Sequence, residues 1–235
     1  MDEFTISNRA KSACEILADA TLATYYKFDI NPNLIDSGPN LLSSISSDVS
    51  FVSSGLISNA LSLDKNTSYL QINDLVGLGT INKPFSISLW IRPYVLSGAL
   101  VYIVASLTPN SWCIPFLGFS TSTTLIAQML SGSIQSVSGP ANLSLSTWHH
   151  IVQTWNATNQ LRLYVDNELV GSNTAATSYT ASSQPIYVRI GSEINVTCSM
   201  GNIDSQTSFQ GDIDEFRIYS RELSADDVCA LYRYR

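Results

Sequence analysis

The sequence is poor in charged residues. Lys, Arg, Asp and Glu make up 13% of its 235 residues, roughly half of their share in an average soluble domain. The formal net charge of −7 leaves no basic surface of the kind that binds nucleic acid non-specifically or holds anionic lipid. Hydroxyl groups take the place of charge, with 36 Ser and 17 Thr, while 45% of the residues are hydrophobic. Such a chain buries a core, and its length fits one all-β domain.

Long hydrophobic runs are also missing. The most apolar stretch, residues 85–105, is interrupted by Arg92 and Pro93, so it fails as a membrane span. Residues 1–11 lack the apolar segment of a secretory signal peptide. We therefore expect no membrane insertion, and a secreted form of this chain would be a mature fragment or an excised domain.

Cysteine is scarce and widely spaced, with no CxxC pair among Cys14, Cys113, Cys198 and Cys229. Zinc knuckles and thioredoxin-like redox motifs need closely spaced thiols, so both are excluded. An even number of distant cysteines favours two long-range disulfides, with buried free thiols as the alternative.

Sequons for N-glycosylation occur at Asn66, Asn142, Asn156 and Asn195. A chain this rich in Asn, Ser and Thr contains about that number by chance. The sequons therefore permit glycosylation without arguing for it.

Apolar and polar residues alternate with period 2 through most of the chain, the pattern of half-buried strands. The predicted strands are Tyr26–Ile30, Phe85–Arg92, Trp148–Trp155, Leu161–Val165, Glu168–Val170, Ile186–Ile190 and Gly211–Tyr219. Two turns, Asn156–Gln160 and Asp166-Asn167, join three of them into hairpins, because Asx residues tolerate positive φ. Segments of this length and spacing predict an antiparallel all-β sandwich of two sheets.

The same alternation predicts a core built from one face of each strand. Its expected members are Phe28, Ile87, Leu89, Ile91, Leu163, Val165, Ile213 and Ile218. Ile213 and Ile218 differ in parity, which indicates a bulge or a two-faced last strand.

Helix signals occur only near the two ends. Ser224 followed by Asp227 is a capping-box variant in front of an apolar stripe, so it predicts a short C-terminal helix. Ser12–Ala20 is a second short helical segment, which leads into the first strand. We expect residues 1–24 to form an N-terminal extension that packs on a domain of residues 25–235.

Eight short blocks follow one another along the chain: Tyr25–Asp29, Asp36–Gly38, Gly55–Leu61, Phe85–Pro93, Trp148–Val152, Leu163–Asp166, Gly211–Tyr219 and Leu223-Ser224. In this order they resemble the laminin-G-like group of the concanavalin A-like lectin/glucanase superfamily, from about Tyr25 to Tyr232. The resemblance implies a jelly-roll sandwich of two curved antiparallel sheets whose first and last strands are neighbours. Two departures stand out: Asn167 replaces the usual Gly, and residues 97–146 match no block of the family.

Catalysis has little support in the sequence. The catalytic glucanases of the superfamily carry a Glu-x-Asp-x-x-Glu pattern, and this chain has none. Alternation in a strand places Asp212 and Asp214 on one face, and within the family this motif is structural or binds calcium. The only histidines, His149 and His150, are adjacent in a predicted strand, so they point to opposite faces and cannot share a metal. We expect both to be structural and the chain not to be an enzyme.

Calcium is the cofactor that the resemblance implies, with Asp29, Asp36 and Asp214 as its expected ligands. Neighbouring first and last strands would bring these carboxylates toward one another, and calcium prefers several converging oxygens. The alternatives are that Asp36 forms an Asx turn and that Asp214 pairs with Arg217 or caps backbone groups.

Ligand binding to a glycan would use exposed aromatic rings, for which Trp112, Trp155 and Tyr179 are the candidates because they lie in or near loops. Trp90 and Trp148 lie in predicted strands and are expected in the core.

The family topology also bears on the cysteines. Cys14 and Cys229 lie just outside the first and last strands, so the resemblance implies a Cys14–Cys229 disulfide and, with it, a Cys113–Cys198 disulfide. We accordingly expect an extracellular, non-enzymatic recognition domain that binds a glycan or an extracellular protein ligand through its loops, with or without calcium. The alternatives are a structural spacer domain of a larger adhesion protein or enzyme and a glycoside hydrolase.

Overall fold

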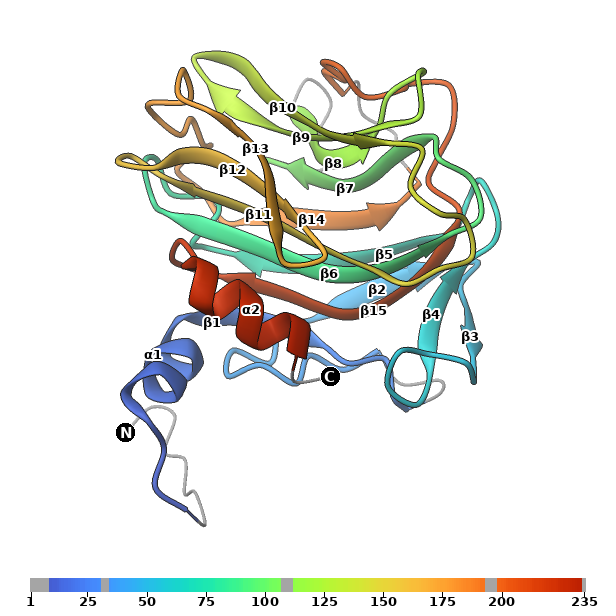
Figure 1. Ribbon diagram of the computed structural model, residues 1–235, viewed down its shortest axis with the longest axis horizontal. Coiled ribbons are helices and arrows are strands. Elements are labelled where there is room, and N and C mark those ends of the chain that lie inside the picture. Colours follow the sequence, from blue (N-terminus) through green and yellow to red (C-terminus); the bar gives the residue numbers. More distant parts are fainter. Residues whose placement is uncertain (1–8, 31–33, 107–111, 193–197, 234–235) are drawn as a thin grey trace.

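The computed structural model describes residues 9–30, 34–106, 112–192 and 198–233. Two antiparallel β-sheets face each other across a common hydrophobic core, with one helix at each end of the chain (Figure 1). The predicted all-β jelly-roll sandwich with a short C-terminal helix is therefore confirmed.

Sheet A has eight strands. Seven form the path β13-β12-β11-β6-β15-β4-β3, and β1 pairs with β15 beside β4. Their bounds are β1 Leu22–Tyr26, β3 Ser50–Val52, β4 Ala60–Leu63, β6 Phe85–Pro93, β11 His149–Asn156, β12 Gln160–Val165, β13 Glu168–Asn173 and β15 Gly211–Tyr219.

Sheet B has seven strands in the order β10-β9-β8-β7-β14-β5-β2. Their bounds are β2 Ser44–Ser47, β5 Tyr69–Leu75, β7 Gly98–Val104, β8 Cys113–Phe119, β9 Thr124–Ser131, β10 Ser133–Ala141 and β14 Ile186–Gly191. Residues 97–146, which match no family block, thus supply four consecutive strands of sheet B.

The core confirms the predicted alternation. All eight predicted core residues are buried. The predicted bulge is present in β15, where the register against β6 shifts between Asp214 and Arg217 and Glu215 has φ 53°. The extra residue moves Ile213 and Ile218 to the same face in spite of their parity.

The first strand departs furthest from its expected bounds. The predicted strand Tyr26–Ile30 is wrong, because β1 ends at Tyr26 and Phe28 has φ 61°, outside the β region. Phe28 nonetheless turns its ring into the core. The hairpin turn at Asp166 and Asn167 has positive φ at both residues, so Asn replaces Gly there without loss of the turn.

The predicted cap of the C-terminal helix is present, and the N-terminal helix has a cap that the sequence analysis did not predict. In α1, Ala13–Thr21, Ser12 and Glu15 form a complete capping box. In α2, Ala225–Arg233, Ser224 Oγ accepts from the backbone N–H of Asp227, 3.2 Å away. α2 lies on the outer face of sheet A (Figure 1), where Val228 packs against Val152, Tyr164 and Tyr219.

A segment that we call the strap, residues 198–209, crosses the outer face of sheet B. It covers a cluster of Ala99, Tyr102, Val104, Cys113 and Ile126 and contributes Ile203 to it. Three backbone hydrogen bonds tie the strap to two strands: Ser199 donates to Cys113 and Asp204 to Phe119, both in β8, and Phe209 donates to Ala99 in β7.

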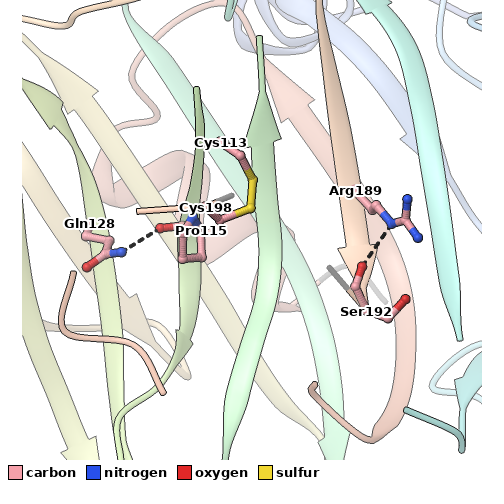
Figure 2. Close-up of a disulfide and its surroundings, with 6 residues drawn as sticks. All are labelled: Cys113, Pro115, Gln128, Arg189, Ser192 and Cys198. Atoms are coloured by element: carbon pink, nitrogen blue, oxygen red, sulfur yellow. Dashed lines mark hydrogen bonds between the residues drawn. A yellow bond between two sulfur atoms is a disulfide. The ribbon is translucent and has the colours of Figure 1, made fainter. Parts of the chain in front are cut away.

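Figure 2 shows how one end of the strap is anchored. Cys198 is joined to Cys113 of β8 by a disulfide. Beside it, the buried amide of Gln128 donates to the carbonyls of Pro115 and Met200, at 2.8 and 2.7 Å, and accepts from the N–H of Asn202. The strap is therefore a fixed cover of this face.

Candidate functional site

Asp36 holds a loop in place. Its Oδ1 accepts from the backbone N–H groups of Tyr25 and Gly38 at 2.7 and 2.8 Å, and its Oδ2 accepts from Leu42 at 2.9 Å. A Cβ on Gly38 would lie 2.9 Å from Oδ1, so this close approach needs glycine. The Asp-Ser-Gly motif is thus an Asx turn that binds the loop after β1 to the edge of that strand, as the alternative interpretation had it.

Asp214 does the same for another loop. It is buried, its Oδ2 accepts from the N–H groups of Leu56 and Ile57, and its Oδ1 accepts from Glu215. Burial raises the pKa of Asp214 to about 7, although the backbone donors act against the rise and the charge of Glu215 adds to it.

The remaining carboxylates of the last strand are also held by side-chain hydrogen bonds and ion pairs. Asp212 accepts from Arg92 Nε and from the Tyr94 hydroxyl, both at 2.7 Å. Glu215 forms an ion pair with Arg217 and accepts from the Tyr25 hydroxyl at 2.6 Å. The acidic motif of β15 is therefore a buried polar network on the outer face of sheet A, without an exposed carboxylate pair.

The structure does not bring the predicted calcium ligands into one site. In the part of the chain that is described, no three His, Cys, Asp or Glu side chains form a group that could hold a metal ion. The prediction that Asp29, Asp36 and Asp214 form a common site is therefore wrong. The carboxylate oxygens of Asp36 and Asp214 accept hydrogen bonds from backbone N–H groups instead. Calcium binding elsewhere stays a prediction.

The two histidines point to opposite faces, as their adjacency predicts. His149 Nδ1 bonds Asp166 at 2.8 Å and its Nε2 bonds the carbonyl of Ser144, and the carboxylate raises the pKa of His149. His150 is buried under α2, stacked on Trp90, with Nε2 3.0 Å from Ser88 Oγ. Burial lowers the pKa of His150 to about 3. Each histidine therefore has a structural environment.

For two of the three aromatic residues predicted to bind a ligand, the prediction is wrong. Trp155 and Tyr179 are 0% exposed and contact each other and Phe85 in the core. Trp155 Nε1 donates to Ala176 and the Tyr179 hydroxyl to Leu78, so even their polar atoms are turned inward. Trp112 is half-buried against the core, and its role in binding stays a prediction.

One of the two predicted disulfides is present. Cys113 and Cys198 are joined, but the Cys14–Cys229 pairing is wrong because Cys229 is a free, half-buried thiol. α2 turns Asp227, Ala230 and Leu231 toward α1, where they share a small cavity with Ala18. At 100° per residue, Cys229 lies on the opposite side of α2.

The sequons differ in access. Asn66 and Asn142 are exposed, whereas Asn156 is half-buried and its amide nitrogen donates to Glu222. Asn195 lies outside the described residues. Glycosylation at Asn66 and Asn142 stays a prediction with accessible side chains.

A groove that the sequence did not predict lies at the edge of the sandwich. It has a volume of about 480 Å³ and runs between the start of β1, the loop after β1 and the loop after β5. Leu22, Leu42 and Leu75 give it an apolar lining, and Asn40 and Asp74 supply polar groups. The turn residues in these loops signal surface loops, but no sequence pattern shows that three distant segments enclose a space.

Exposed apolar side chains lie at this groove. Val76 lines it and is 63% exposed, and Leu41, between the lining residues Asn40 and Leu42, is 73% exposed. Asn40 Nδ2 donates to the carbonyl of Ala23 in β1, and the Oδ1 of Asn40 has no partner among the described residues. The groove thus offers apolar contact with hydrogen-bonding groups beside it.

A model of the concanavalin A-like lectin/glucanases superfamily matches residues 64–229. The chain belongs to this superfamily. Pentraxin-related protein PTX3 of Mus musculus is a relative of this chain. The two are 24% identical over 147 residues, which are 62% of this chain and 38% of the relative. The protein of the same name from Homo sapiens is 27% identical over 104 residues, which are 44% of this chain and 27% of the relative. The chain therefore spans well under half the length of both.

Solved structures share the superfamily fold. Domain 4 of AbnA, a GH43 extracellular arabinanase from Geobacillus stearothermophilus, in complex with arabinotriose, has a TM-score of 0.60 at 20% identity, over 91% of this chain and 98% of that one. The binding domain of botulinum neurotoxin serotype D has a TM-score of 0.66 at 18% identity, over 95% and 53%. At these identities the likeness shows the fold alone.

No helix in the described part of the chain is long and apolar enough to cross a membrane.

Proposed function

We propose that this chain is an extracellular, non-enzymatic recognition domain that binds a glycan or protein ligand through the loops at the edge of its sandwich. The observation that carries the proposal is the groove between β1 and the loops after β1 and β5. Its volume of about 480 Å³ lies within the usual range of ligand sites, roughly 300–1,000 Å³.

The chemistry of the groove supports a ligand with an apolar face and hydrogen-bonding edges. Leu42, Leu75 and the exposed Val76 offer apolar surface, and Asp74 and Asn40 offer oxygen acceptors. Sugars and peptide segments both combine these features. The groove contains no Lys, Arg or His, so an anionic ligand would have no partner for its charge.

The comparisons support recognition over catalysis. One structural neighbour holds arabinotriose, and another solved chain of this fold, with a TM-score of 0.65 at 17% identity, is from botulinum neurotoxin type C, whose cell entry depends on two ganglioside molecules. The buried, hydrogen-bonded state of Asp212, Asp214 and Glu215 argues against a glycoside hydrolase, whose acid and nucleophile must reach the substrate. The Cys113–Cys198 disulfide supports an extracellular location, where such bonds persist.

The test is to fill the groove. A Cβ on Gly77 would have only the Cβ of Ser220 within 4 Å, at 3.7 Å, so Gly77→Leu adds a side chain to the groove without moving the backbone. The wild type and the variant are applied to an array of glycans and an array of purified extracellular proteins. We expect a ligand for the wild type that Gly77→Leu binds at least tenfold more weakly.

Ala157→Leu is the matched control, because Ala157 is exposed in the hairpin turn between β11 and β12, away from the groove. It should bind like the wild type. A wild type that binds nothing above background on either array would refute the proposal and leave the spacer domain as the better explanation. Turnover of any member of a polysaccharide panel would establish the hydrolase instead.

A further inference from the structure

A second hollow lies at the opposite end of the sandwich from the groove. It has a volume of about 110 Å³ and is lined by Asn66, from the turn before β5, by Tyr102 of β7 and by strap residues 205–208. The groove lies after the ends of β5 and β15, and the hollow lies before their starts. The seven residues of β5 separate the two by roughly 20 Å.

The lining of the hollow is polar and carries no charge. It consists of two carboxamides, Asn66 and Gln206, three hydroxyl residues of the strap, and the buried Tyr102. An anionic ligand would lose hydration here without gaining a counter-charge, because no Lys, Arg or His lines the hollow. Neutral hydroxyls can exchange their water contacts for hydrogen bonds to such groups without any cost in unpaired charge.

The strap holds this lining rigidly. Asp204 accepts from the N–H of Gln206 at 3.0 Å and from Thr207 Oγ1 at 3.3 Å, so its carboxylate is used to shape the strap. Ser208 pairs with Ala99, and the neighbouring Phe209 is fully buried. Because the backbone of the strap is held in place before a ligand arrives, ordering it adds little to the entropy cost of binding.

A donor and an acceptor remain available in the hollow. Asn66 Oδ1 accepts from Gln210 Nε2 at 2.7 Å, and Gln206 Nε2 donates to Ser205 Oγ at 3.1 Å. These bonds leave Asn66 Nδ2 and Gln206 Oε1 without a partner among the described residues. One sugar hydroxyl can accept from the first of these groups, and another can donate to the second.

We propose that the hollow is a subsite for one uncharged sugar unit at the end of a glycan, bound by Asn66 and Gln206. This inference rests on the proposed recognition function and assigns the glycan to the strap side of the molecule. An N-linked glycan at Asn66 would replace one of the two hydrogens on Nδ2, and its first sugar would block the hollow.

The experiment uses the full chain without a glycan on Asn66 and a panel of uncharged and acidic monosaccharides, followed by saturation-transfer NMR and titration. Gln206→Met keeps the length of the side chain and removes both polar atoms, and Gln206 is exposed, so folding should be unaffected. We expect an uncharged sugar to bind the wild type and to bind Gln206→Met about tenfold more weakly, the loss typical of one or two hydrogen bonds. Gln184→Met, the same change at another exposed position, should bind normally.

The outcomes separate this inference from the proposed function. Sugar binding that survives Gln206→Met but is lost in Gly77→Leu would overturn the hollow and keep the recognition function at the groove. Stronger binding of an acidic sugar would refute the argument from the uncharged lining. A wild type that binds a protein ligand and no sugar of the panel would overturn the hollow while the recognition function stands.

Discussion

Replacing Asp36 distinguishes a residue that fixes a loop from one that binds calcium. In the structure its carboxylate is 2% exposed and accepts three backbone N–H groups, those of Tyr25, Gly38 and Leu42. Hydrogen bonds to a charged acceptor contribute roughly 1.5–3 kcal/mol each, and bonds that share one carboxylate do not add fully. We therefore expect Asp36→Ala to lower the free energy of unfolding by about 4 kcal/mol.

Asp36→Asn provides the graded comparison. The amide keeps one oxygen for Tyr25 and Gly38, but it turns an NH₂ group toward the N–H of Leu42 and loses that bond. The expected loss is about 1–2 kcal/mol. Asp64→Ala, at an exposed carboxylate, is the control and should change stability by less than about 0.5 kcal/mol.

Urea unfolding is measured for all variants in chelator and again in excess calcium. If Asp36 fixes the loop, the loss in free energy of unfolding in chelator is largest for Asp36→Ala, smaller for Asp36→Asn and smallest for the control Asp64→Ala. Excess calcium then leaves these differences unchanged. A loss for Asp36→Ala below about 1 kcal/mol in chelator would refute the hydrogen-bond argument. A loss that appears only with calcium would show that Asp36 is a metal ligand after all, since a ligand that binds only the folded state stabilises it.

Two further predictions concern buried side chains. The pKa of His150 is lowered to about 3 in the folded state, so below about pH 6.5 only the unfolded state takes up this proton, and stability falls on acidification by about 2 kcal/mol between pH 6.5 and 5. The raised pKa of Asp214 changes stability in the opposite direction over much of this range, because the folded state keeps a proton that the unfolded state releases. The quantity to measure is therefore the free energy of unfolding of the wild type minus that of His150→Phe. If this difference is the same at about pH 6.5 and about pH 5, His150 is not buried. Trp155→Leu should cost about 3–5 kcal/mol in urea unfolding through lost packing and the bond to Ala176; a loss under 1 kcal/mol would mean that Trp155 is not a core residue.

The fold could be predicted from the sequence because the alternation of apolar and polar residues is visible within each strand and decides which face of that strand enters the core. Ile87, Leu89 and Ile91 mark one face of β6 on their own, and the parity break between Ile213 and Ile218 locates a bulge without knowledge of the partner strand. Strand ends were less secure, since the positive φ of Phe28 has no signature in an aromatic residue.

The site was harder to predict because burial in loops is not periodic. Trp155 and Tyr179 lie beside turn residues, yet their rings meet in the core, and only the assembled sheets decide this. The same holds for Asp36 and Asp214, whose partners are backbone N–H groups that any sequence supplies. The groove and the hollow each combine segments far apart in the chain, so neither leaves a motif.

The residues that anchor the strap to the sheet are different from the residues that it presents to solvent. Its fixed points are the Cys198 disulfide, the buried Ile203 and the buried Phe209, whereas Ser205, Gln206 and Thr207 between them are exposed. Mutations at the exposed positions change surface chemistry at little cost in stability, because the anchors lie elsewhere. Over generations, such a segment can accumulate new side chains and acquire new specificities, while selection for a folded chain acts on a different set of residues.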